Sequence, residues 1–419
     1  MPLPSGREGW DEGGKAVTRY VVILGSLDTK GLEVDFLRQQ VRAEGGAPLV
    51  VDTGVLPEPT TPADITRHDV AHAAGSSIEA LIRQGDKTHA LVTMAQGAST
   101  CLVKLFQEGQ LGGVLSIGGS RGTALSTLVM QSLPVGLPKL MVSTMASGNN
   151  TFGPYVGTKD VAVMHSVADV QGVNAVTRRI FGNAAAAIVA MSRVGRPVQR
   201  GDKPILTASM LGVSTTLVSQ IQSLLEDENE VIAFHSVGTG GRAMEELIDS
   251  GLVAGVFDVS PGEITALLVD GPFSAGPERM RAAGRRGIPQ VVAPGGLDFI
   301  IEGPVDDLPA RYRGRKIMVH TPIISLVRTS ADEMEQAARL IASRLAESGG
   351  PAAVILPLRA FGWFAREGQP LHDPESDRAF IETFRACVPA GVPLVELDTH
   401  LNDPAVGETA VRLMRDMLG

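Results

Sequence analysis

The sequence predicts an α/β protein of two Rossmann-like domains, whose mainly parallel sheets face each other across a cleft. Both halves repeat a pattern of short apolar strand, polar or Gly-rich turn and amphipathic helix, as doubly wound folds do. A polar segment broken by Gly and Pro, residues 194–204, separates the halves. We therefore expect a disordered lead-in at residues 1–16, an N-terminal nucleotide-binding domain at 17–199 and a C-terminal domain at 200–419.

Composition narrows the functional classes. With 419 residues, of which 44% are hydrophobic, the chain can bury two cores. The net charge of -9 argues against a nucleic-acid-binding surface. Cys101 and Cys387 lie far apart, which suits the reducing cytoplasm and gives neither a disulfide framework nor a cysteine metal site. We expect no membrane contact, because no apolar run reaches roughly 20 residues, and residues 1–16 lack the apolar core of a signal peptide.

The first domain opens with a strand at Tyr20–Leu24, a polar loop at 25–31, a helix to about Glu44 and a strand at Pro48–Val51. This spacing is typical of a βαβ unit in a parallel sheet. Asp52 follows the second strand, where a dinucleotide-binding fold places the acid that binds ribose. The glycine fingerprint of such folds is missing, so this match is weak.

Further along the first domain we expect strands at 89–93 and 139–143, each followed by a loop of small and hydroxylic residues. These loops, at 94–100 and 144–150, would join the other polar loops at the carboxyl edge of the sheet. A long helix at 172–193 closes the domain. It is apolar on more than one face, so it is either buried or pairs with a second copy, and we expect a homodimer.

The central stretch, Leu111–Met130, combines an apolar strand, a glycine-dense turn and a helix that begins near Arg121. Such a turn suits an anion, because glycines permit close approach and the helix N-terminus offers unpaired N–H groups. The groups that would bind the anion are the backbone of Gly118, Gly119 and Gly122, the hydroxyls of Ser120 and Thr123, and the guanidinium of Arg121. Two alternatives stay open: an ordinary strand-to-helix turn, and the nucleophile elbow of serine hydrolases, since residues 118–122 fit G-x-S-x-G.

The second domain repeats the rhythm of the first. A strand within residues 205–214, a helix through Glu226 and a strand at Glu230–His235 lead to another Gly-rich turn at 235–245. Polar clusters then follow later strands, at Asp298, at 320–328 and at 398–403. In the last cluster Asp398, His400 and Asn402 would point to one side, which suits metal or phosphate chemistry. The alternative is that His400 and Asn402 cap the following helix.

One further pair has two interpretations. His68 and His72 lie one turn apart on an expected helix, where they could share a metal ion or simply be solvated.

Several runs of this sequence are similar to one protein family. They are Ile23–Gly31, Gly118–Thr123, Gly153–Asp160, Asn183–Ala187, His235–Glu245, Gly287–Asp298 and Asp398–Asp403. Together they resemble, in unbroken order over about residues 20–415, the uncharacterised bacterial and fungal proteins related to the N-terminal ATP-binding domain of the tomato mosaic virus resistance protein. The resemblance implies a two-lobed α/β protein that binds ATP, tends to dimerise and has no established reaction.

From this resemblance and the turn chemistry we expect ATP and Mg²⁺ in the first domain. The expected nucleotide-binding residues are Asp28, Thr29, Lys30, Gly118, Gly119, Ser120, Gly122 and Thr123. Lys30 would face the phosphates and Asp28 would hold Mg²⁺. A small anionic substrate, as yet unidentified, would meet His235, Arg242, His320 and Arg328 of the second domain.

Three functional classes therefore remain. The first is an ATP-binding protein, with ATP-dependent enzyme activity left open. The second is a serine hydrolase with Ser120 as nucleophile, Asp298 as the acid and His320 or His400 as the base, an order along the chain that hydrolases permit. The third is a non-catalytic regulatory module with a bound nucleotide.

Overall fold

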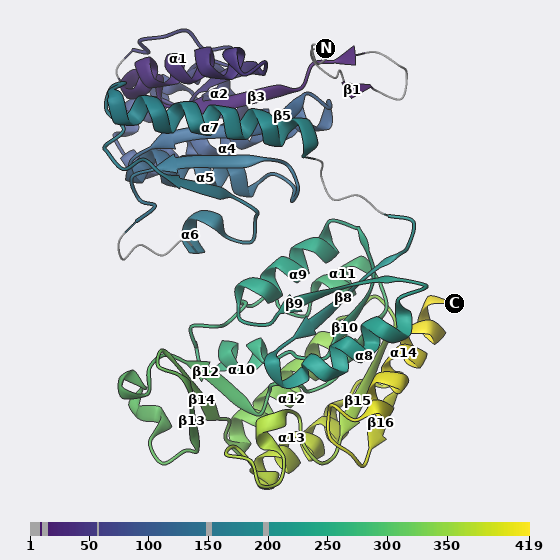
Figure 1. The fold of residues 1–419 in the computed structure, drawn as a ribbon. Helices are drawn as coiled ribbons and strands as arrows, with labels where there is room; N and C mark the ends of the chain where they lie inside the picture. Colours follow the sequence, from purple (N-terminus) through teal and green to yellow (C-terminus); the bar gives the residue numbers. More distant parts are fainter. Residues whose placement is uncertain (1–8, 11–15, 57, 148–152, 196–200) are drawn as a thin grey trace. The chain divides into compact units, whose positions relative to one another are not determined.

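The computed structural model describes residues 9–10, 16–56, 58–147, 153–195 and 201–419. The chain divides into two compact units, Met1–Val198 and Gln199–Gly419. Each unit is built on a sheet of parallel strands covered by helices, which confirms the predicted α/β class (Figure 1). Most of the expected lead-in and the middle of the expected linker lie outside the described residues. Within the lead-in, β1 (Gly9–Trp10) pairs antiparallel with β2 (Ala16–Val17).

The sheet of the first unit has five parallel strands in the order β4-β3-β5-β6-β7. The strands are β3 (Tyr20–Gly25), β4 (Ala47–Asp52), β5 (Leu111–Gly118), β6 (Lys139–Ser143) and β7 (Ala162–His165). The chain runs from β3 to β4 on one side and then crosses to β5 on the other side of β3. The order therefore reverses between β3 and β5, and ligands of open α/β sheets bind at such a point.

Helices cover both faces of this sheet (Figure 1). They are α1 (Leu27–Ala43), α2 (Arg67–Ala73), α3 (Ile78–Gln84), α4 (Lys87–Gln107), α5 (Ser120–Gln131), α6 (Gly153–Val156) and α7 (Ala175–Val194). One core joins the sheet to α1 and α7, and a second joins it to α2, α3, α4 and α5. The helix after β3 and the helix after β5 thus lie on opposite faces, and a crevice forms between their N-termini.

One predicted strand of this unit is wrong. Residues 89–93 lie in α4, whose first turn is capped by Asp86, because Oδ1 of Asp86 accepts hydrogen bonds from the amides of Thr88 and His89 at 2.8 and 3.0 Å. A short apolar run does not distinguish a strand from a helix by itself. The loop expected at 94–100 is also helical, and Gly97 allows α4 to approach α2, because a Cβ there would lie 1.9 Å from the carbonyl oxygen of Val70.

The long helix α7 is buried on one face. Its side chains Phe181, Ala184 and Ile188 are fully buried against the sheet and α1, whereas Val176 on its outer side is 44% exposed. Packing within the unit therefore accounts for most of its apolar surface, without a second copy of the chain.

The second unit has a sheet of six parallel strands in the order β16-β15-β11-β10-β8-β9. Its strands are β8 (Ile205–Met210), β9 (Glu230–His235), β10 (Val253–Asp258), β11 (Gln290–Val292), β15 (Ala352–Pro357) and β16 (Leu394–Leu397). Its helices are α8 (Thr215–Leu225), α9 (Thr239–Asp249), α10 (Glu263–Leu268), α11 (Ala282–Arg286), α12 (Ala331–Ala346), α13 (Pro374–Cys387) and α14 (Pro404–Leu418). One core involves α8 and α14, and separate cores involve α9 to α13.

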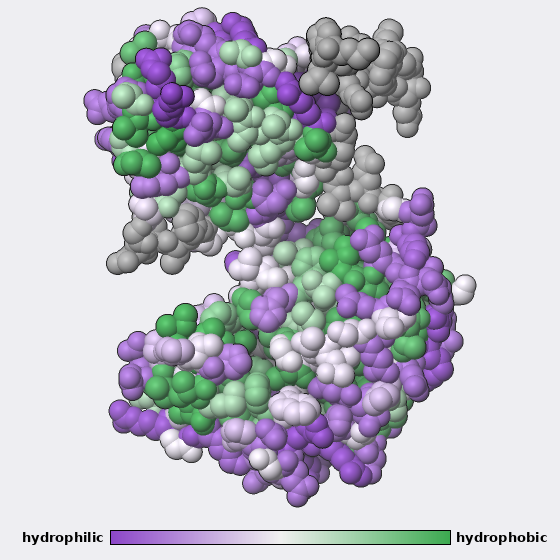
Figure 2. Space-filling model, viewed as in Figure 1, coloured by the Kyte–Doolittle hydropathy of each residue, from purple (hydrophilic) through white to green (hydrophobic). Residues whose placement is uncertain are grey.

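A small antiparallel sheet is inserted after β11, in the order β12-β14-β13. Its strands are β12 (Phe299–Glu302), β13 (Ile317–Thr321) and β14 (Ile324–Arg328). Apolar side chains gather over this sheet on the face shown in Figure 2, and Val319 and Ile323 are 56% and 70% exposed. Among the described residues, no helix is long and apolar enough to cross a membrane.

Candidate functional site

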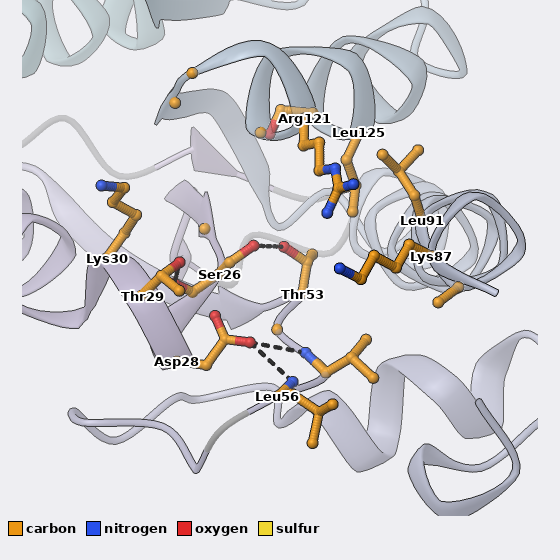
Figure 3. Close-up of a pocket in the computed structure, with 18 of the residues that line it drawn as sticks. Ser26, Asp28, Thr29, Lys30, Thr53, Leu56, Lys87, Leu91, Arg121 and Leu125 are labelled. Carbon is orange, nitrogen blue, oxygen red and sulfur yellow. Dashed lines mark hydrogen bonds between the residues drawn. The ribbon is translucent and has the colours of Figure 1, made fainter. Parts of the chain in front are cut away.

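A cavity of about 710 Å³ lies at the carboxyl edge of the first sheet, where β3, β4 and β5 end (Figure 3). Its polar wall comes from the segments that follow these strands, residues 25–30, 53–56 and 118–122. Its apolar wall comes from aliphatic side chains of α3, α4 and α5, namely Leu81, Ile82, Leu91 and Leu125. The cavity thus occupies the crevice at the β3/β5 reversal and combines a polar half with an apolar half, as small-molecule sites do.

The N-terminus of α5 opens into this cavity. Its N-cap is Gly119, which has no side chain to accept the first amides. Within the described residues, the amides of Ser120, Arg121 and Gly122 have no hydrogen-bond acceptor, and the first closed turn is the bond from the Thr123 amide to the Gly119 carbonyl at 2.8 Å. These unpaired donors and the helix dipole make the end of α5 attractive to an anion.

Two of the glycines at this turn are not required by the backbone. Gly119 has φ of -80°, and a Cβ there would approach nothing closer than Thr144 Oγ1 at 3.7 Å. A Cβ at Gly122 would come no closer than 3.5 Å, to the carbonyl oxygen of Ile117. At Gly118, in contrast, a Cβ would lie 2.9 Å from the Cα of Gly122. Gly118 therefore serves packing, whereas Gly119 and Gly122 keep the cavity wall free of side chains.

Two cations face the cavity. Figure 3 shows the ammonium of Lys87 and the guanidinium of Arg121 pointing into the same space, near the hydroxyl of Thr53. Neither side chain makes a hydrogen bond or ion pair with another described residue, and both are exposed. Each stands in the first turn of its helix, α4 or α5, so the cavity is electropositive on this side.

Two aspartates organise the opposite side of the cavity. Asp52 is buried, and its Oδ1 accepts hydrogen bonds from the amides of Leu27 at 3.0 Å and Gly54 at 2.8 Å. Burial raises the pKa of Asp52, against the effect of these two bonds. Asp52 thus caps α1 and lies beneath the site, which differs from a ribose-binding role. Asp28 holds the next loop, because its Oδ2 accepts from the amides of Val55 and Leu56, each at 3.0 Å (Figure 3).

Most of the predicted nucleotide-binding residues are brought together at the cavity. Asp28, Thr29, Lys30, Gly118, Gly119, Ser120 and Gly122 all line it. The ammonium of Lys30 donates a hydrogen bond to the Val170 carbonyl, at a kink where Lys30 leaves helical geometry. Thr123 is buried and does not line the cavity, since its hydroxyl is hydrogen-bonded to that of Ser143 at 2.6 Å. We therefore exclude the Thr123 hydroxyl from the candidate ligand contacts.

Sequence reasoning missed Lys87, Thr53 and the aliphatic wall. Lys87 was hidden by the wrong assignment of a strand just after it. Gly85, which is in the left-handed region with φ of 69°, and the N-cap Asp86 are the usual signals of a helix end followed by a helix start. Correct use of these two residues would have placed Lys87 in the first turn of α4.

The corresponding turn of the second unit is closed. Oε1 of Glu263 accepts hydrogen bonds from the amides of Gly238 at 2.6 Å and Gly241 at 3.1 Å, at the start of α9. Glu263 is itself paired with the fully buried Arg279, at 2.6 Å. A carboxylate of the protein therefore occupies the position that an anionic ligand would need.

The residues predicted to bind a second substrate are dispersed over the second unit. His235 ends β9 and Arg242 lies on α9, both exposed. His320 lies on the edge strand β13, where its ring contacts Phe364 edge-on at 6.2 Å between centroids. Arg328 is buried, and it donates to Asp377 at 2.5 Å and to the Asp298 carbonyl at 2.6 Å. Arg328 is therefore part of the internal structure of the unit and does not face a ligand.

The last polar cluster does not converge on a ligand. Asp398 forms an ion pair with Arg359 on the surface, and Nδ2 of Asn402 donates a hydrogen bond to the carbonyl oxygen of Val213 at 2.7 Å. The cap of α14 is Asp403, which accepts from the Ala405 amide at 3.0 Å, so the cap predicted at His400 and Asn402 is wrong. Across the parts of the chain that the structure describes, no three His, Cys, Asp or Glu residues form a metal-binding group. His68 and His72 are exposed.

The comparisons with known proteins assign the family. The family model for the N-terminal domain of an uncharacterised protein family (UPF0261) matches residues 19–197, and the model for its C-terminal domain matches residues 203–418. The chain belongs to this family. The family has no assigned function, so the functional argument rests on the site.

Three similar proteins illustrate the range of likeness. A UPF0261 protein of Clostridium tetani is 38% identical over 389 residues, covering 92% of this chain and 96% of that protein. The ToMV resistance protein Tm-1 of Solanum lycopersicum is 31% identical over 378 residues, covering 85% of this chain but 50% of that protein. The solved UDP-GlcNAc 2-epimerase of Methanocaldococcus jannaschii has 9% identity and a TM-score of 0.20, over 66% of this chain and 83% of that one. Bacterial and plant relatives are thus found, and the fungal relatives stay a prediction.

Proposed function

We propose that this protein binds a nucleotide such as ATP in the cavity of the first unit, with its phosphates at the N-terminus of α5. The observation that carries the proposal is the open end of α5: three amides have no acceptor among the described residues, and the backbone does not require glycine at 119 or 122. Backbone donors of this kind, together with the guanidinium of Arg121, are suited to phosphate oxygens.

The rest of the cavity suits the remainder of a nucleotide. The hydroxyls of Ser26, Thr29 and Thr53 line the polar side and can exchange hydrogen bonds with a sugar. The aliphatic wall of Leu81, Leu91 and Leu125 offers an apolar surface to a planar base. The volume, about 710 Å³, lies within the range of small-molecule sites.

Asp28 is the residue that would hold Mg²⁺. It lines the cavity, and within the described residues its Oδ1 makes no hydrogen bond, because Oδ2 accepts from both loop amides. Mg²⁺ in nucleotide sites is bound by one or two carboxylates together with phosphate oxygens and waters. Oδ1 of Asp28 could therefore be the protein ligand of a Mg²⁺ ion that is bound to ATP. The ion would neutralise part of the charge of the phosphates.

The proposal is for binding, and an ATP-dependent reaction would need a second substrate. The exposed His235, Arg242 and His320 are accessible to a small anionic substrate, whereas the buried Arg328 is not. The described residues that line the cavity include no histidine, so none of them offers Ser120 an imidazole base. This favours nucleotide binding over the serine hydrolase.

Calorimetric titration of ATP with excess Mg²⁺ tests the proposal. We expect wild type to bind, and Gly122→Val to lose affinity while keeping its melting temperature. A Cβ at Gly122 makes only an ordinary van der Waals contact, 3.5 Å from the Ile117 carbonyl oxygen, but the added side chain would block a phosphate. Gly303→Val is the matched control, since a Cβ there has nothing within 4 Å and Gly303 lies in the other unit. The proposal fails if wild type gives no heat at millimolar ATP, or if Gly122→Val binds as wild type does.

We also propose a cytoplasmic homodimer. Val176, on the outer side of α7, is 44% exposed, and Ile180 and Ala187 are only partly buried, so this outer side is the surface that a second copy would cover. Light scattering at micromolar concentration should return the mass of a dimer. A monomer at every concentration would contradict this part of the proposal.

A further inference from the structure

The cation that sequence reasoning missed, Lys87, stands at a position that weakens its own helix. Lys87 is the first residue of α4, and no acidic residue occupies the first turn. The positive end of the helix dipole disfavours a cation there. Arg121, in the first turn of α5, has the same disadvantage, and that turn also lacks an acidic residue. The fold thus gains nothing from the charge at either position.

The backbone that carries Lys87 is held in place. The N-cap Asp86 accepts hydrogen bonds from the amides of Thr88 and His89, and these bonds lower the pKa of Asp86. One turn further along α4, Leu91 belongs to the apolar wall of the cavity. The base of the Lys87 side chain is therefore fixed at the rim, and its ammonium points into the cavity beside the guanidinium of Arg121 (Figure 3).

The other lysine of the cavity has a different environment. The ammonium of Lys30 donates to the Val170 carbonyl, whereas Lys87 and Arg121 make no hydrogen bond or ion pair with any described residue. Among the described residues, the carboxylates that line the cavity, Asp28 and Asp86, accept hydrogen bonds from backbone amides and pair with neither Lys87 nor Arg121, so a ligand can supply the complementary charge. Two cations on one side of a cavity interact more strongly with a ligand as its number of phosphate charges increases.

We infer that Lys87 and Arg121 form a cation pair that selects the ligand by its phosphate charge, favouring nucleoside triphosphates over diphosphates and monophosphates. Lys87 is then a specificity-determining residue. This inference rests on the proposed function, because it concerns the same cavity. It adds to that proposal the chemical class of the preferred ligand and the residue that sets the preference.

Calorimetric titration of ATP, ADP, AMP and inorganic tripolyphosphate, at constant Mg²⁺ and salt, tests the inference. Wild type should bind ATP most tightly and AMP least tightly. Lys87→Gln should weaken ATP and tripolyphosphate by about tenfold or more, since a charge-assisted hydrogen bond is lost, but AMP by no more than about threefold. The melting temperature of this variant should equal or exceed that of wild type, because the unfavourable charge is gone.

Lys104→Gln is the matched control, because Lys104 lies on the same helix, 4.0 Å from Glu108 and exposed to solvent. It should leave all four affinities unchanged. The inference is overturned if Lys87→Gln weakens AMP and ATP by the same factor, or weakens neither, while wild type binds nucleotide and the proposed function stands. If wild type binds none of the four compounds, the proposed function fails, and the inference fails with it.

Discussion

The two glycine-rich turns that precede α5 and α9 look alike in sequence but differ in structure. Before α5, Gly119 and Gly122 have room for a Cβ and the first amides of the helix have no acceptor among the described residues. Before α9, Gly238 has φ of 84°, and a Cβ at Gly241 would lie 2.0 Å from Oε2 of Glu263. The glycines of the second turn are needed by the fold, whereas two of those in the first are not.

The difference shows how a glycine-rich turn can be assessed. Conformational need and close packing explain a glycine without any ligand, and both are present before α9. Before α5 neither applies to Gly119 or Gly122, and a cavity of about 710 Å³ lies in front of them. In the second unit, a cavity beside the turn, lined by Ser236 and Glu263, has a volume of about 10 Å³. The proposed close approach of a ligand would account for the glycines of the first turn.

The largest expected effect comes from opening the closed turn. Glu263→Ala would leave the amides of Gly238 and Gly241 without their acceptor and remove one partner of the buried Arg279. Breaking a buried ion pair by removing one partner typically costs about 3–5 kcal/mol. Urea unfolding should show a loss of that size for the second unit, whereas ATP affinity of the folded protein should not change.

The control for this variant is Glu335→Ala, because Glu335 pairs with Arg339 at 3.8 Å on the surface. Its effect on the free energy of unfolding should stay within about 1 kcal/mol. A loss of ATP binding in Glu263→Ala at full folding would mean that the second turn, and not the first, holds the nucleotide.

A second test concerns a buried carboxyl group of the second unit. Asp298 is fully buried after β11, and neither carboxylate oxygen has a hydrogen-bond partner in the described structure. Burial raises the pKa of Asp298 to about 7, against the attraction of Arg328 and with the repulsion of Asp377. The folded state therefore keeps the proton up to a higher pH than the unfolded state does. Between about pH 4 and pH 7 the unfolded state loses this proton first, so the free energy of unfolding should fall as pH rises.

Asp298→Asn removes this titration. The stability of the variant relative to wild type should therefore increase with pH between pH 5 and pH 8. Below pH 7 the increase should be at most about 1.4 kcal/mol per pH unit. Chemical unfolding of both proteins at each pH measures the difference. A difference that does not change with pH would show that the carboxyl is ionised throughout, with a partner that the structure does not contain.

Part of the fold could be predicted from the sequence. The strands Lys139–Ser143 and Glu230–His235 were predicted with the bounds that the structure has, because each mainly apolar run ends at a clear turn. Residues 118–122, for which glycine and hydroxyl content predicted an anion site, line the cavity of the first unit, and the anion itself stays a prediction. The strand assigned to 89–93 was wrong, because a short apolar run has no intrinsic preference that outweighs the helix cap at Asp86.

The closure of the second turn could not be predicted from the sequence. Glu263 contacts Gly238 across 25 residues of chain, and no local pattern identifies a carboxylate that will fold back onto a helix N-terminus. Similarly, Thr123 fits a phosphate-binding pattern, but its hydroxyl is hydrogen-bonded to Ser143 on a neighbouring strand. Both outcomes depend on tertiary contacts between elements that are separate in the sequence.

A smaller effect, on ATP affinity, is expected from a substitution at Ser120 in the turn before α5, and it distinguishes nucleotide binding from serine hydrolase activity. Ser120→Ala removes one hydroxyl among several donors, and a single neutral hydrogen bond is worth about 0.5–1.5 kcal/mol, so ATP affinity should fall by about tenfold or less. A fluorophosphonate should not label wild type. Stoichiometric labelling of Ser120 together with no ATP binding would reverse the assignment, because a nucleophile contributes by covalent catalysis.

The smallest expected effect has the opposite sign from most substitutions. Gly122→Ala places a methyl group within the first turn of α5, where a Cβ lies 3.5 Å from the Ile117 carbonyl oxygen without a clash. It should raise the free energy of unfolding by about 0.4–1 kcal/mol, because alanine restricts the unfolded chain more than glycine does. Gly241→Ala, which clashes with Glu263, should destabilise the protein. Thermal unfolding of the two variants checks this contrast, and destabilisation by both would mean that the fold requires both glycines.

Hydrogen exchange of the two helix N-termini, with and without ATP and Mg²⁺, tests the central claim most directly. Without nucleotide, the amides of Ser120, Arg121 and Gly122 should exchange rapidly, and those of Gly238 and Gly241 slowly, because Glu263 already accepts from the latter pair. Nucleotide should slow exchange at Ser120 to Gly122 and leave Gly238 and Gly241 unchanged. New protection at Gly238 and Gly241, with none at Ser120 to Gly122, would contradict the claim that the open turn of the first unit binds the phosphates.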